Sequence, residues 1–161
     1  MSAESIAGSM KKPKSYQAIL WGGLIAGILD ITAAFVNSGL RGGGSPIRIL
    51  QVIASGVLGA ESYKGGLRSA ALGLALHFFI ALVATAVYYV ASRKLKFLVQ
   101  WAVVCGLLYG VAVYLFMYQI VLPLVFTSRN PMSIATVITG LIIHMLFVGL
   151  PISLVIRRYS K

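Results

Sequence analysis

Three ionisable side chains occur within long apolar stretches of the sequence. Asp30 is the single Asp, Glu, Lys, Arg or His between residues 15 and 40, and His77 and His144 lie in stretches without Lys, Arg, Asp or Glu. In a membrane-spanning helix an unpaired central carboxylate costs about 2.5–3.5 kcal/mol. Such side chains therefore usually face the protein interior, pair with one another and mark paths for protons or ions. We expect these three residues to form a proton or ion pathway, with Asp30 paired to one of the histidines.

The same residue types allow cofactor or metal chemistry as alternatives. Two histidines on facing helices could hold the iron of a haem b group, and Gly73 and Gly140, one turn before them, would leave room for the porphyrin. His77, His144 and Asp30 together would give an open zinc site of the catalytic type. We predict neither a resident cofactor nor a metal, with haem bound by the two histidines as the alternative.

A structural role is a third possibility for the histidines. A neutral imidazole can donate a hydrogen bond to a backbone carbonyl, or to Ser69 or Thr136, and would then only specify how the helices pack. The chain has no H-E-x-x-H, G-x-S-x-G or P-loop motif and only three acidic residues. The sequence therefore predicts no catalytic residue and does not favour an enzyme.

The elements that carry these residues are long apolar segments. Hydrophobic residues make up 59% of the chain and charged residues 11%, whereas soluble domains have about 25% charged residues. A helix needs about 20 apolar residues to cross the hydrocarbon core, and strands with open edges cannot cross it. We therefore predict an all-α membrane protein whose single transmembrane domain, residues 16–156, contains four transmembrane helices, at 16–38, 67–91, 97–121 and 133–156.

The first connection contains a further short helix. Ser45 is a helix cap and Pro46 suits a first turn, which predicts a helix over about 46–59. Its apolar residues, such as Ile53 and Ala54, share one face, and Gln51 and Ser55 lie on the other. This helix is too short to span, so we expect it to lie in the membrane interface on its apolar face, with a partial re-entrant helix as the alternative.

The basic residues indicate the orientation of the chain. Lys and Arg outnumber Asp and Glu by 14 to 3. Nine of these cations lie in the tail 1–15, the connection 92–96 and the end 157–161, on one side of a four-span chain. The positive-inside rule then places both termini in the cytoplasm. The expected partners are anionic lipid headgroups in the bilayer, not nucleic acid, because no basic face or motif accompanies the charge.

A cleaved signal peptide ending near Ala34 is the competing interpretation of the first span.

Two short patterns recur along the chain in the same order. Residues 69–77 read S-x-x-x-G-L-x-x-H and residues 136–144 read T-x-x-x-G-L-x-x-H; residues 23–27 and 106–110 both read G-L-x-x-G. We therefore predict a tandem repeat of two helical hairpins about an axis normal to the membrane, with both histidines at the same depth.

The glycine pairs at 23/27 and 106/110 suit close packing of helices, either within the chain or between copies in a homo-oligomer. Pro151 is expected to kink the last span.

Three segments carry a resemblance to a known group. Residues 72–78 (LGLALHF), 106–110 (GLLYG) and 148–151 (VGLP) resemble uncharacterised small four-helix bacterial inner-membrane proteins, to which YagU-type proteins are distantly similar. The resemblance implies a bacterial inner (plasma) membrane location and no particular reaction or ligand.

The sequence thus predicts a small integral inner-membrane protein that moves protons or a small solute through a polar layer around Asp30, His77 and His144. A haem-binding redox module and a structural or assembly protein without a ligand are the alternatives.

Reporter fusions test the predicted topology. Fluorescent protein at either terminus should fluoresce and alkaline phosphatase there should be inactive, because both ends are predicted to be cytoplasmic. A phosphatase fusion near Arg129 should be active. Termini on opposite faces, or a mature product that starts after Ala34, would contradict the four-span topology.

Overall fold

The predicted all-α fold is confirmed. A computed structural model describes residues 15–125 and 133–160, and within these ranges it contains helices and no strands. The basic tail, the connection around Arg129 and Lys161 lie outside the described residues. The helices are α1 (Ser15–Leu40), α2 (Pro46–Leu58), α3 (Gly66–Lys94), α4 (Phe97–Gln100), α5 (Ala102–Phe116), α6 (Leu122–Val125), α7 (Ile134–Ile143) and α8 (Leu150–Tyr159), with a 3₁₀ stretch η2 (Gly59–Tyr63) and π-helical stretches η3 (Met117–Val121) and η4 (His144–Gly149).

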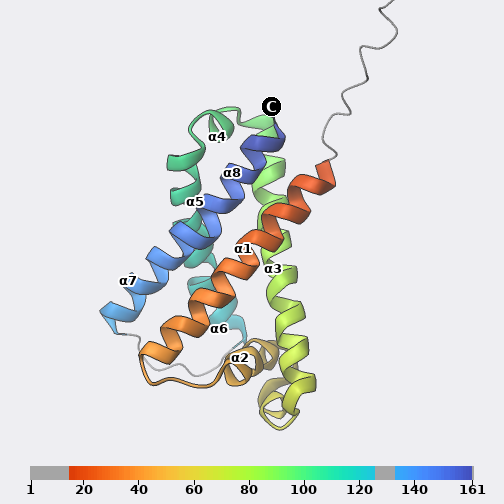
Figure 1. The fold of residues 1–161 in the computed structure, drawn as a ribbon, viewed down its shortest axis with the longest axis vertical. Coiled ribbons are helices and arrows are strands. Elements are labelled where there is room, and N and C mark those ends of the chain that lie inside the picture. The colour runs from red at the N-terminus through yellow and green to blue at the C-terminus, as the bar shows by residue number, and fades with distance from the viewer. Residues whose placement is uncertain (1–14, 126–132, 161) are drawn as a thin grey trace, which may run out of the picture.

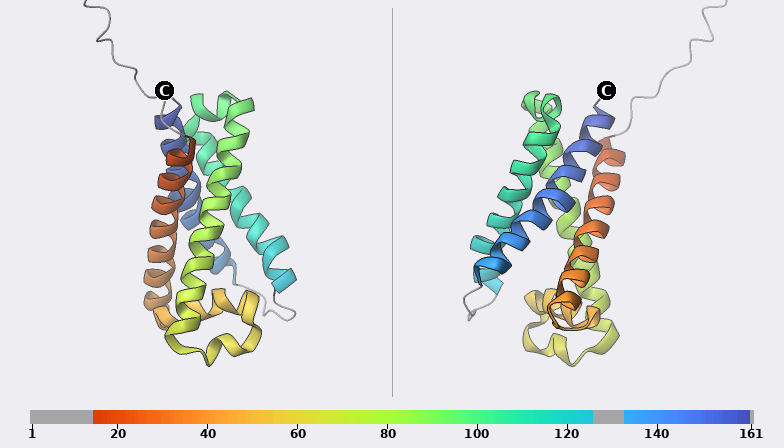
Figure 2. Two further views of the ribbon diagram at one scale, coloured as in Figure 1. Left: turned by 90° about the vertical axis from the view of Figure 1, so that its right-hand side faces the viewer. Right: turned by 60° about the vertical axis from the view of Figure 1, so that its left-hand side comes forward.

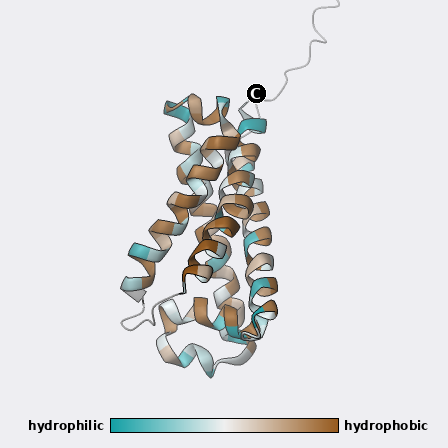
Figure 3. Ribbon diagram, turned by 90° about the vertical axis from the view of Figure 1, so that its left-hand side faces the viewer, coloured by the Kyte–Doolittle hydropathy of each residue, from teal (hydrophilic) through white to brown (hydrophobic). Residues whose placement is uncertain are grey.

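Four of the continuous helical segments are long and apolar enough to cross a membrane. They are Tyr16–Leu40, Gly66–Lys94, Ala102–Val121 and Ile134–Tyr159, as expected of a multi-pass membrane protein. The third span is shorter than predicted, because the backbone of Trp101 leaves the helical conformation and separates the single turn α4 from α5. Apolar residues dominate the middle of the long helices and hydrophilic ones gather mainly toward their ends (Figure 3).

The spans are arranged with both ends of the described chain on one side. The start of α1, the end of α8 and α4 lie together at what we call the termini end (Figure 1). At the opposite end, the α2 end, α2 lies across the bundle beneath the long helices (Figure 2). This arrangement follows from an even number of crossings.

Glycines allow the two helices of each hairpin to pack closely. A Cβ on Gly27 of α1 would lie 2.7 Å from the Phe78 ring on α3, and one on Gly110 of α5 would lie 2.6 Å from the Cα of Met145 in η4. Phe78 and Met145 each directly follow the histidine of their own helix. The second glycine of each pair therefore meets the same position of the partner helix in both hairpins.

The first glycine of each pair shows the same equivalence. Gly23 packs against Leu82, and Gly106 packs against the Ser153 side chain and the Gly149 carbonyl. Leu82 and Gly149 each lie five residues after the histidine of their helix. These matched contacts are those expected of a tandem repeat of two hairpins.

The buried face of α2 differs from the predicted one. The polar residues Gln51 and Ser55 are buried together with Ala54, whereas Val57 and Leu58 are exposed. The cause is Gly73 of α3, whose missing side chain admits the Leu50 carbonyl, so that α2 lies with its backbone against α3. Gln51 Nε2 then donates at 3.2 Å to the carbonyl of Gly66 in the first turn of α3, which also accepts a hydrogen bond from Ser69 Oγ at 3.1 Å. Val52, Val57 and Leu58 face outward, which suits a helix in contact with lipid.

Both π-helical stretches end just before a Leu-Pro pair. Leu122 N–H donates to the Met117 carbonyl and Leu150 N–H to the Met145 carbonyl, each five residues earlier, and Pro123 and Pro151 follow. A proline cannot donate to the preceding turn, and a π-type shift in hydrogen bonding accommodates it. The sequence predicts a kink at Pro151, and at this place the last span contains a π-helical stretch that begins at His144.

Arg41 joins the two hairpins at the α2 end. From the end of α1 its guanidinium donates to Thr139 Oγ1 at 2.8 Å and to Thr136 Oγ1 at 3.0 Å, both on α7. The Asn37 side chain also accepts a hydrogen bond from Nε of Arg41. At the termini end the hairpins share a buried apolar core formed by Ala18, Ala26, Tyr88, Val148, Ile152 and Ile156.

Replacing Gly110, which lies at a close helix crossing, should destabilise the protein. Gly110→Ala places a methyl group against the His144 carbonyl and Met145 Cα, which are backbone atoms that cannot rotate away. Overpacking of this kind costs about 1–3 kcal/mol, measurable as the free energy of unfolding in mixed micelles. Gly39→Ala is the matched control, because nothing lies within 4 Å of its added Cβ. Equal stability of the two variants would contradict the close crossing.

Candidate functional site

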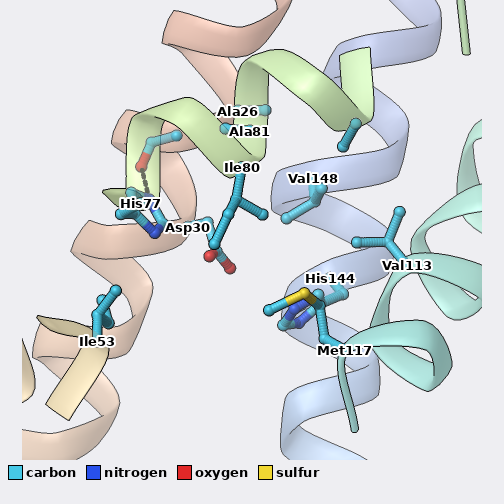
Figure 4. Close-up of a pocket in the computed structure, with 12 residues that line it drawn as sticks. Ala26, Asp30, Ile53, His77, Ile80, Ala81, Val113, Met117, His144 and Val148 are labelled. Carbon is cyan, nitrogen blue, oxygen red and sulfur yellow. Dashed lines mark hydrogen bonds between the residues drawn. The ribbon is translucent and has the colours of Figure 1, made fainter. Parts of the chain in front are cut away.

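The three predicted site residues line one cavity inside the bundle. Asp30 of α1, His77 of α3 and His144 of η4 surround a space of about 120 Å³ (Figure 4). The remaining wall is formed by Ala26, Gly27, Ile53, Ile80, Ala81, Ala84, Val113, Met117 and Val148. At a rise of about 1.5 Å per residue, Asp30 lies roughly 21 Å from Tyr16 and roughly 15 Å from Leu40 along α1. The cavity is therefore deep within the span, closer to the α2 end.

Both histidines are held by backbone carbonyls. His77 Nε2 lies 2.9 Å from the Gly27 carbonyl oxygen on the neighbouring helix α1. His144 Nδ1 lies 2.9 Å from the carbonyl oxygen of Gly140, one turn earlier on its own helix. A carbonyl only accepts, so the ring nitrogen must carry the proton in each pair. The neutral histidines are therefore fixed in different tautomers.

Asp30 does not form the direct pair that we expected. Its side chain is half-buried and points into the cavity, across from His144 (Figure 4). Among the described residues no hydrogen bond or salt bridge connects it to His77 or His144. The close approach of α1 and α3 at Gly27 explains the difference, because it offers His77 a carbonyl at hydrogen-bonding distance. The predicted alternative, in which the histidines bond to the backbone, describes the observed contacts.

The polar atoms left over in the cavity are acceptors. Each neutral histidine has used its N–H group, so His77 Nδ1 and His144 Nε2 carry lone pairs, and the ionised Asp30 carboxylate only accepts. No Lys or Arg is among the residues that line the cavity. The site is therefore complementary to a proton, a cation or another hydrogen-bond donor, and unsuited to an anion.

Tyr114 is a neighbour of the site that the sequence reasoning missed. Its ring lies edge-on to His144, with centroids 5.3 Å apart, and is stacked on Tyr118 at 5.8 Å. The Tyr114 hydroxyl is buried without a hydrogen-bond partner among the described residues. The signal in the sequence was the spacing Gly106, Gly110, Tyr114, which puts this ring on the packed face of α5.

The internal repeat explains how the cavity is lined. His77 and His144 are equivalent in the two hairpins, as are Ala81 and Val148, each four residues later, and all four line the cavity. The cavity thus lies where the two hairpins face each other. Asp30, three residues after Gly27, corresponds to Val113, three residues after Gly110. The site therefore has two related histidines and one carboxylate, which breaks the internal symmetry.

The cavity in this structure is too small for the haem of the alternative prediction. Pockets for organic ligands usually measure about 300–1,000 Å³. The cavity of about 120 Å³ would have to open by movement of the helices before it could admit a porphyrin between His77 and His144. The open zinc site is not formed either, because within residues 15–125 and 133–160 no three His, Cys, Asp or Glu side chains come within reach of one metal ion.

The cavity is closed toward the termini end. Val148 forms part of its wall and belongs to the buried core, which continues through Ile152 and Ile156. On the other side Ile53 of α2 and Met117 of η3 border it. In this conformation apolar side chains border the cavity toward both ends of the bundle.

No family model, curated protein or solved structure matches the chain. The resemblance to small bacterial inner-membrane proteins stays a prediction.

The two histidines should have different tautomers in their neutral forms. We expect ¹⁵N spectra of protein labelled at histidine to show His77 protonated at Nε2 and His144 protonated at Nδ1, because each of these atoms faces a carbonyl. His77→Gln and His144→Gln variants assign the signals. The same tautomer at both positions would contradict the described contacts.

Proposed function

We propose that this chain is a multi-pass protein of the bacterial inner membrane that moves protons through the cavity around Asp30, His77 and His144. The observation that carries the proposal is that the three residues, which lie far apart in sequence, line a single cavity at membrane depth. Ionisable residues in membrane spans are costly and usually serve ion or proton transfer. We place both termini in the cytoplasm on the basis of the charge distribution.

The size and chemistry of the cavity favour protons over a larger hydrophilic solute. About 120 Å³ corresponds to room for about four water molecules at the volume of liquid water. Asp30 and the lone pair on each histidine can accept a proton, and the lining offers no fixed cation to repel it. Protons could pass between these groups through the intervening water.

The closed apolar core favours a gated transporter over an open pore. Tyr88, Val148 and Ile152 seal the bundle between the cavity and the termini end. Protons that reach Asp30 from the α2 end could continue only if the hairpins move relative to each other. The π-helical stretch η4 begins at His144 and lies on the α5 contact, so it is the element most suited to such a movement.

Proton flux into proteoliposomes tests the proposal. With a potassium gradient, valinomycin and an internal pH dye, we expect flux in the unmodified protein and a loss of roughly tenfold or more in Asp30→Asn, since a positioned proton-transfer group contributes about 100-fold or more. His144→Gln should lower the flux in the same direction.

The matched control is Thr32→Val, which changes an exposed polar residue of α1 near Asp30 that does not line the cavity. Its flux should equal that of the unmodified protein. Flux that is unchanged in Asp30→Asn, or no flux above empty liposomes under either polarity of the gradient, would overturn the proposal.

A further inference from the structure

An apolar groove runs between α3 and α5 beside the polar cavity. It has a volume of about 360 Å³ and is lined by Ile80, Val83, Ala84, Val87, Tyr109, Ala112, Val113 and Phe116. We call it the α3–α5 groove. Toward the termini end the groove is bounded by Tyr109, whose hydroxyl donates to the Ala84 carbonyl at 2.7 Å and so bridges the two helices.

The groove and the cavity share one wall. Ile80, Ala84 and Val113 line both spaces. Asp30 therefore lies behind three apolar side chains that also face the groove. A molecule that occupied both spaces would place a small polar group beside Asp30 and an apolar chain between α3 and α5.

From this shared wall we infer that the cavity and the α3–α5 groove together bind a single-chain amphiphilic cation, with its amine head at Asp30 and its hydrocarbon chain passing between the Ile80 and Val113 side chains into the groove. The inference rests on the proposed function and names the substrate class of the same site. The head must be a donor because the free polar atoms of the cavity are acceptors. It must be small because the cavity has room for only about four water molecules, which excludes a whole phospholipid headgroup.

A second copy of the chain fits the groove less well. Its spans could cover the apolar residues, but they would bring no cation to Asp30. In the described spans the Asp, Glu, Lys, Arg and His side chains at this depth are Asp30, His77 and His144, and all three line the cavity of their own copy. The arginines and lysines lie toward the ends of the spans. An alkylammonium ion supplies both the donor and the apolar surface.

The cation and a proton compete for one carboxylate. The ammonium head forms its ion pair with the ionised Asp30, and a proton on that carboxylate removes the charge with which the head pairs. His77 from α3 and His144 from η4 are the titratable groups that face the same cavity, and the α2, α5 and η3 residues that line it are uncharged. A cation and a proton would thus use the carboxylate in turn.

Photolabelling in nanodiscs tests the inference without any gradient. The probe is a dodecylammonium ion with a diazirine in its chain, and the matched comparison is the dodecyl sulfonate with the same diazirine. We expect the ammonium probe to label residues 80–87 and 109–116. Asp30→Asn should lower this labelling by roughly tenfold, the loss expected for one charge-assisted hydrogen bond. The sulfonate should label these segments no more than other lipid-facing ones.

A substitution in the groove gives an independent check. Val83→Trp fills the groove from its lipid side, where the residue is 46% exposed, so the fold should tolerate it while the labelling falls. Val90→Trp is the matched control, two turns later on α3, 60% exposed and outside the groove lining. Its labelling should be unchanged.

Three results would overturn the inference. They are equal labelling by the ammonium and sulfonate probes, unchanged labelling in Asp30→Asn, and Val83→Cys cross-links between copies in a Cys105→Ser background that exclude the probe. The outcomes separate the two proposals. Proton flux without binding of the ammonium probe overturns this inference alone, whereas binding without flux in proteoliposomes overturns the proposed function alone.

Discussion

The fold depends on the close approach of helix backbones at glycines. Lipid provides little driving force for helices to associate, so small residues that permit tight packing determine where they meet. Gly27, Gly73 and Gly110 each lie where a side chain would overlap the neighbouring helix. These crossings also determine the polar contacts, because a backbone that comes this close presents its carbonyls to the next helix. The Gly27 carbonyl that accepts from His77 is one result.

The polar site follows from the same packing. The backbone satisfies one nitrogen of each histidine, and what remains in the cavity is a carboxylate and two lone pairs. Such a site attracts protons and cations, and the duplicated hairpins place it where they face each other. The second hairpin has Val113 where the first has Asp30. That replacement removes a second charge from the cavity and makes part of its wall apolar, which is where the α3–α5 groove adjoins it.

Periodicity and composition predicted the four spans, the cap at Ser45 and the common depth of the two histidines. They did not predict which face of α2 is buried. Gln51 and Ser55 form the polar side of an amphipathic helix, yet both are buried, because Gly73 admits the α2 backbone against α3 and Gln51 donates to the Gly66 carbonyl. Tyr114 was missed for a related reason. Tyr114 on α5 contacts His144 of the last span, and a periodic pattern within one span does not predict contacts with another span.

The sequence by itself determined that the chain is helical and contains four membrane-length segments. It also determined that Asp30, His77 and His144 lie in segments with no other Asp, Glu, Lys, Arg or His. These properties depend on local composition and on the thickness of the hydrocarbon core. Only the tertiary structure decided that the three residues line one cavity, that the histidines bond to backbone carbonyls instead of Asp30, and that an apolar groove adjoins the site. These features depend on how closely and at which turn the helices cross, and that is set by contacts between residues far apart along the chain.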